Sequence, residues 1–232
     1  MKKLTSQQIN SLFDFVKKHY VNWYDLQLEL VDHLATDIEK IIEKNSQLSF
    51  EQARDLAFKK FGITGFYDII KAKTHAMQKH ILKLLANEFY NFFSSQKIFG
   101  FIGLWFLIFE ILFFTNFNDW VFIIIFYSPL VFSMFYIMKY QINKNKKAKQ
   151  NKKILLYENV LFQEYIIIFN LLTQPTFFLV SHNFFDPEII SKYGIIISFI
   201  LAFIYLFLYL DIFIVPKKLK IEYSRIYQFA EN

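Results

Sequence analysis

The chain has 232 residues, of which 55% are hydrophobic and 21% aromatic, and its formal net charge is +6. It contains no cysteine, which excludes disulfides, thiolate metal sites and thiol nucleophiles. The apolar residues are unevenly placed, because residues 1–95 are polar and periodic whereas residues 98–215 are mostly apolar. This division predicts an all-α fold, with a small cytoplasmic helical domain followed by a four-helix transmembrane bundle.

The first 95 residues show the spacing of amphipathic helices. Two capping boxes, Thr5-x-x-Gln8 and Ser49-x-x-Gln52, predict where the first and third helices begin. Apolar residues at every third or fourth position predict a second helix over about residues 23–44. The third helix is expected to turn Leu56 inward and to stop at Gly62, and a fourth helix continues toward the apolar half.

Four apolar segments follow, each about long enough to cross a ~30 Å hydrocarbon layer. These predicted spans cover about residues 98–114, 120–138, 160–180 and 195–215. Pro216 is expected to end the last of them. The predicted organisation is a helical module at 1–75, a helical connector at 76–96, a transmembrane domain at 97–216 and a basic tail at 217–232.

Lysines separate the four spans into two pairs and predict their orientation. Residues 139–153 carry seven lysines and no acidic residue, and the basic tail adds more. The predicted outer loops, 115–119 and 181–193, together carry one lysine and three acidic residues. Because lysine-rich loops stay in the cytoplasm, we expect a multi-pass protein of a bacterial inner membrane with both termini cytoplasmic. The same rule accounts for the basic charge, so no nucleic acid is expected as a partner.

A row of polar residues lies on the second predicted helix. Glu29, His33 and Asp37 share one face because they are four residues apart, and Asp32 adjoins them. Such a row could bind a metal ion or relay protons, but one helix face cannot surround a metal ion. The favoured alternative is a histidine held by carboxylates at a contact between helices. We expect no metal site and no cofactor, and these four residues are the candidates for binding a partner.

Five polar residues inside the predicted spans are candidates for an intramembrane site. They are Glu110, Glu164, Asn170, Gln174 and Asp211. An ionisable side chain in a span costs about 2.5 kcal/mol or more when it is buried unpaired, which makes it a functional candidate. Glu110 and Asp211 lie near span ends, so they could instead reach the membrane interface or a lysine. The amides could line a substrate path or bond to a neighbouring helix. No nucleotide-binding, hydrolase or metallopeptidase motif is present, so no enzymatic activity is predicted.

One part of the sequence resembles a known family. The segment YDLQLELVDHLATDIE, residues 24–39, is followed by SFEQA at 49–53 and by Phe61-Gly62. Together these resemble the N-terminal helical module of HAAS-like or permease-prefix-like bacterial membrane proteins, which show E-x-x-D-H and then S-x-E-x-A…FG before several spans. Similar arrangements occur in Bacteroidota membrane proteins without assigned function. The resemblance covers roughly residues 5–65 and implies a cytoplasmic module that binds another protein, without catalytic residues.

The predicted function is therefore protein–protein binding by a membrane-embedded regulator, anchor or complex subunit. Its expected partners are membrane lipid and another membrane or cytoplasmic protein. The alternative is a small transporter or channel component with a polar path along the third span.

Overall fold

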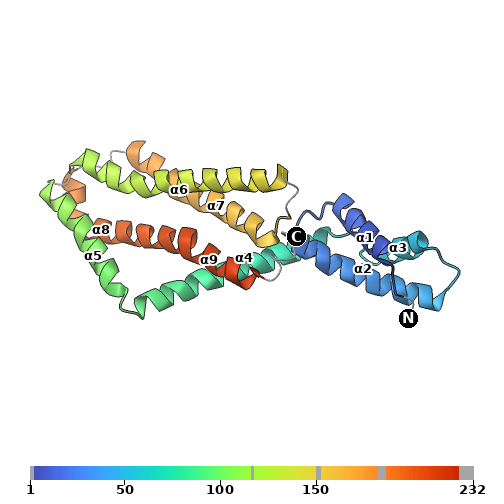
Figure 1. Cartoon of the computed structure of the whole chain (residues 1–232). Coiled ribbons are helices and arrows are strands. Elements are labelled where there is room, and N and C mark those ends of the chain that lie inside the picture. The colour runs from blue at the N-terminus through green and yellow to red at the C-terminus, as the bar shows by residue number, and fades with distance from the viewer. Residues whose placement is uncertain (1–2, 116–117, 150–152, 182–186, 225–232) are drawn as a thin grey trace. The chain divides into compact units, whose positions relative to one another are not determined.

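A computed structural model describes residues 3–115, 118–149, 153–181 and 187–224 of the chain (Figure 1). All regular structure in these ranges is helical, which confirms the predicted all-α class. The elements are α1 Ser6–Lys18, α2 Tyr24–Lys44, α3 Phe50–Lys59, α4 Tyr67–Phe93, α5 Ile98–Phe114, α6 Asp119–Lys149, α7 Leu156–Ser181, α8 Pro187–Tyr209, the π-helical turn η1 Leu210–Ile214, and α9 Val215–Glu222. Within the described ranges, residues 3–79 and 147–160 form one compact unit, and residues 80–146 and 161–224 form a second.

The first unit is built around α1, α2 and α3, which pack together at the blue end of the chain in Figure 1. Leu12, Leu34 and Ala57, one from each helix, are completely buried in its hydrophobic core. Both predicted capping boxes are present, at the starts of α1 and α3. The prediction for Leu56 is wrong, since 42% of its surface is exposed. Successive residues of an α-helix are about 100° apart, so Leu56 turns away when its neighbour Ala57 faces the core.

α4 is one continuous helix of 27 residues, and it ends in a sharp bend. Between Phe93 and the start of α5 the helix direction changes by 86°. The bend contains neither glycine nor proline, and the Ser95 hydroxyl replaces helical hydrogen bonds there. It donates to the Phe92 carbonyl over 2.9 Å and accepts from the Lys97 N–H over 3.3 Å. Serine side chains compete with the helix ladder in this way, which explains a break that composition did not reveal.

Two helical segments, Trp120–Lys147 and Lys192–Glu222, are long and apolar enough to cross a membrane. The bent pair of α4 and α5 becomes a third if it is counted as one span, because α5 alone has 17 residues. The chain is thus a helical protein with two or three candidate membrane spans. α7, which contains the third predicted span, is not among them, and its side chains from Gln174 onward lie outside the described residues.

Aromatic and polar contacts hold α5 against α8 in the second unit. The Trp105 indole N–H donates to the Ser198 hydroxyl over 3.1 Å. One helical turn earlier, the rings of Phe101 and Phe199 meet edge to face with centroids 5.6 Å apart. This mixture of ring packing and one buried hydrogen bond is typical of contacts between apolar helices.

The second half of α4 runs antiparallel to the last helices. His80 pairs with Glu222 over 3.0 Å, and Glu88, further along α4, pairs with Lys218 in α9. The Phe89 and Phe203 rings stack with centroids 5.4 Å apart. Residues later in α4 pair with residues earlier in the segment from α8 to α9, so the two stretches run in opposite directions.

Pro216 does not end the last helix, although the fourth predicted span was expected to end there. The helix passes through η1 and continues as α9 to Glu222, with Pro216 in the first turn of α9. In η1 the Val215 N–H donates to the Leu210 carbonyl, five residues back. A proline has no N–H to donate, and the first turn after such a shift is a position where that loss is tolerated.

Candidate functional site

The predicted partner-binding carboxylates on α2 are used partly inside the first unit. The Glu29 carboxylate lies 2.7 Å from the Lys73 ammonium of α4. The Asp37 carboxylate lies 3.0 Å from Lys60, the C-cap residue of α3. Both pairs join α2 to another part of the same unit. Exposed pairs of this kind add at most about 1 kcal/mol each, so they fix orientation more than stability.

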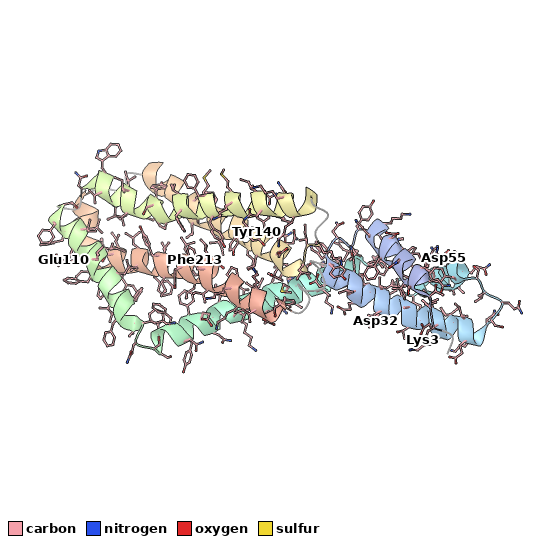
Figure 2. The ribbon with its side chains drawn as sticks, in the orientation of Figure 1. Lys3, Asp32, Asp55, Glu110, Tyr140 and Phe213 are labelled. Atoms are coloured by element: carbon pink, nitrogen blue, oxygen red, sulfur yellow. The ribbon has the colours of Figure 1, made fainter. Side chains whose placement is uncertain are left out.

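The other two predicted residues of this row face solvent. Asp32 is exposed on α2, where Figure 2 labels it. The His33 side chain is 66% exposed, and its Nε2 lies 4.0 Å from the Glu29 carboxylate. No three histidine or carboxylate side chains are grouped to hold a metal ion in the part of the chain that the structure describes. The structure therefore separates the row into two residues that bind lysines and two that remain accessible.

A contact centred on Asp25 was not predicted. Asp25 lies in the first turn of α2, and its two carboxylate oxygens accept the Leu156 N–H over 3.0 and 3.3 Å. The adjacent Tyr24 N–H donates to the Ile154 carbonyl over 2.9 Å. The Lys153 ammonium lies 4.1 Å from the centre of the Tyr24 ring. Because Leu156 is the first residue of α7, Asp25 satisfies a helix N–H that has no partner within its own helix. We call these five residues the Asp25 clamp.

The Asp25 clamp is partly shielded from water. Leu155 is fully buried and Leu156 keeps 4% of its surface exposed. Burial raises the pKa of the Asp25 carboxyl above its usual value of 3.8, and the hydrogen bond from Leu156 opposes this shift without cancelling it. Next to the clamp, Lys147 and Glu158 form an ion pair of 2.7 Å. An acidic residue in the first turn of α7 is favoured by the helix dipole.

The predicted intramembrane residues lie on three elements, with Glu110 on α5, Glu164, Asn170 and Gln174 on α7, and Asp211 in η1. Glu110 is half-buried on α5, at the position labelled in Figure 2. The Asn170 amide donates to the Ile166 carbonyl of its own helix over 2.8 Å, and the Gln174 side chain lies outside the described residues. Glu164 is half-buried on the same helix. An amide bonded to its own backbone has less capacity left for a substrate.

Asp211 is the predicted residue with the most unusual surroundings. It lies in η1 with 1% of its surface exposed, so the surrounding helices shield it. It lines a small void, here called the Asp211 pocket, together with Ser133, Ile137, Tyr165, Ile168, Phe169, Leu208 and Ile212. Glu164 is close enough for its charge to interact with that of Asp211. The structure thus brings two of the predicted intramembrane residues together and adds Tyr165 and Ser133.

A larger cavity of about 540 Å³ lies where α4 bends into α5 and faces α8. Its lining is mostly aromatic and aliphatic, with Glu88, Asn91 and Lys97 as polar members. A cavity of this volume is within the range of small-molecule sites.

Comparison with protein-family models gives no match, and comparison with curated proteins and with solved structures gives none either. The resemblance to HAAS-like or permease-prefix-like modules therefore stays a prediction that rests on the residues quoted for it. Three features of the described residues bear on function: the Asp25 clamp, the exposed surface of the first unit and the Asp211 pocket.

Proposed function

We propose that the chain is a four-span protein of a bacterial inner membrane that acts by binding another protein through its N-terminal helical module. It would serve as a regulator, an anchor or a complex subunit, without catalysis of its own. Both termini and the module would lie in the cytoplasm. The observation that carries this proposal is the Asp25 clamp, which joins the module to the segment that starts α7.

The Asp25 clamp and the charge counts together support the orientation. The lysine-rich segment 139–153 favours the cytoplasm by the positive-inside rule. Tyr24 binds Ile154 directly after that segment. Two parts of a chain that share hydrogen bonds must lie on the same side of a membrane, so the module follows the lysines to the cytoplasmic side.

The clamp also suggests how binding could be transmitted. Asp25 caps the first residue of α7, so a movement of α2 changes the end of a helix that leads into the second unit. The solvent-facing residues of the module offer a surface for the partner. Asp32 and His33 supply polar contacts, and Tyr20 and Ile63 are large apolar side chains that are 83% and 108% exposed. Exposed apolar anchors surrounded by polar groups are typical of protein-binding surfaces.

The topology can be tested with single cysteines, because the natural chain has none. Asn118→Cys, Asn145→Cys and Ser224→Cys all replace exposed residues. In intact spheroplasts a membrane-impermeant maleimide should label position 118 only, and permeabilisation should expose positions 145 and 224. Labelling of position 224 from outside would show that α7 does not cross the membrane. Labelling of position 145 from outside would reverse the whole orientation.

The binding function can be tested by affinity purification of the full chain after mild crosslinking, with co-purifying proteins identified by mass spectrometry. The double variant Asp32→Ala, Ile63→Asp should lose a partner that the natural chain retains. Asp55→Ala is the matched control, because Asp55 is another exposed carboxylate of the same unit, paired with its neighbour Arg54. A specific partner that the double variant still binds would contradict the proposed surface. The absence of any partner would contradict the function.

The alternative, a transporter with a polar path along the third span, has weaker support. The Asn170 amide is bound to its own helix, and Glu110 lies on α5, which packs against α8.

A further inference from the structure

We infer that Asp211 forms a binding site for one small monovalent cation, a proton or a sodium ion, together with Tyr165 and Ser133. The inference is independent of the proposed partner-binding function, because it rests entirely on residues of the second unit.

The Asp211 pocket contains polar atoms that have no hydrogen-bond partner among the described residues. Asp211 is 99% buried and its Oδ2 has no hydrogen-bond partner among the described residues. Tyr165 is 97% buried and its hydroxyl is equally without a partner there. Both residues line the same void. Buried polar atoms are nearly always satisfied in folded proteins, so two orphans that face one space indicate that something fills it.

The carboxyl group of Asp211 would carry a negative charge if it were ionised. An ionised carboxylate in an apolar interior is strongly disfavoured unless a positive charge or several donors accompany it. A cation that neutralises the carboxylate removes this penalty. The same requirement is met by a proton carried on the carboxyl group or by a sodium ion held between oxygens.

The void of the Asp211 pocket is small, with a volume of about 10 Å³. A space of this volume holds about one water-sized probe and no larger ligand. The occupant is therefore a single atom or ion, with at most a water molecule beside it.

Residues that line the void carry further oxygen atoms. The Ser133 hydroxyl donates its hydrogen to the Leu130 carbonyl over 2.8 Å, which leaves its lone pairs for another donor or a cation. Ile212 also lines the void, and its carbonyl lacks the usual helix donor four residues on because that residue is Pro216. π-Helical turns such as η1 are frequent at functional sites.

Titratable groups from both neighbouring helices surround Asp211. From α6, the rings of Tyr136 and Tyr140 lie with their centroids 5.9 Å from that of Tyr165. From α7, Tyr165 enters the pocket and the Glu164 charge interacts with Asp211. A second carboxyl group close by strengthens the attraction for a cation, since two negative charges at short distance disfavour each other.

The test is infrared difference spectroscopy of the full chain in lipid nanodiscs, titrated from about pH 5 to about pH 9. The signal is the carbonyl stretch of a protonated carboxyl group, assigned to Asp211 by its loss in Asp211→Asn. We expect this band at low pH and its disappearance at high pH. If replacing choline with sodium moves the midpoint, the site takes sodium in competition with protons. If sodium has no effect, the site takes protons alone.

Variants that retain Asp211 keep the test valid even if Asp211→Asn folds poorly. Tyr165→Phe and Ser133→Ala should each shift the midpoint or change the effect of sodium, because each removes an oxygen of the pocket. Glu110→Gln, which alters a carboxyl group on α5 outside the pocket, should leave the transition unchanged. An Asp211 that stays protonated across the whole range, or stays ionised without any response to sodium, would overturn the inference.

Discussion

Replacing Asp25 by alanine tests the Asp25 clamp most directly. The substitution removes both acceptors of the Leu156 N–H, at 3.0 and 3.3 Å, and leaves the first amide of α7 unpaired. Loss of a capping carboxylate costs about 0.5–2 kcal/mol, and loss of its charge from a helix N-terminus overlaps with that figure at about 0.3–1 kcal/mol. Because burial already penalises this carboxylate, we expect a net loss of about 1 kcal/mol.

Hydrogen–deuterium exchange of the full chain measures this loss locally. A loss of about 1–2 kcal/mol corresponds to about 5–30-fold faster exchange where opening controls the rate, and we expect the lower part of this range for the peptide that covers residues 153–160. Asp25→Asn keeps one acceptor oxygen and should cause a smaller change. Asp32→Ala, on the exposed face of the same helix, should leave that peptide unaltered. If Asp25→Ala also leaves it unaltered, the clamp does not hold the two segments together.

Three further predictions follow from single contacts. Burial raises the pKa of Asp25 above 3.8, so the folded chain binds this proton more readily than the unfolded chain does. The resulting stabilisation is present at low pH and is lost as pH rises through the raised pKa. Asp25→Asn should therefore flatten this part of a profile of melting temperature against pH. Leu34→Ala should lower the free energy of unfolding by about 2–5 kcal/mol in a denaturant titration, because Leu34 is fully buried, whereas Lys73→Ala should cost less than about 1 kcal/mol at its exposed ion pair. Ser198→Ala leaves the Trp105 N–H without an acceptor and should cost about 1–3 kcal/mol. It is measured in the same titration on a chain in which Trp23 and Trp120 are replaced by phenylalanine, so that the fluorescence reports Trp105 alone.

Local features of the first unit were predictable because their causes lie within a few residues of sequence. Thr5 and Ser49 each carry the residue that completes a capping box three positions later, and both boxes are present. The apolar period of α2 placed Leu34 in the core for the same reason. Leu56 was misplaced because a short helix with two alanines on its inner face gives a weak periodic signal.

Contacts between distant segments could not be predicted in this way. Asp25 is an acidic residue in the first turn of α2, and the helix dipole alone accounts for it there. Its partner Leu156 is 131 residues away, and no pattern joins the two. The bend after Phe93 was missed for a related reason, since Ser95 breaks the helix through its own hydroxyl without a glycine or proline to mark the site.

Asp211 shows how the surroundings of a residue can differ from those that its position in the sequence suggests. Its sequence position near the end of a predicted span suggested that the carboxylate could reach the interface or a lysine. The structure gives it 1% exposure, with residues of α6, α7 and α8 around it, and the helix continues beyond it through η1 and Pro216. The additional helical turns place Asp211 inside the helix rather than at its end. The proline that was expected to end the span lies instead in the first turn of α9, four residues beyond Ile212, whose carbonyl therefore has no helix N–H at the usual position.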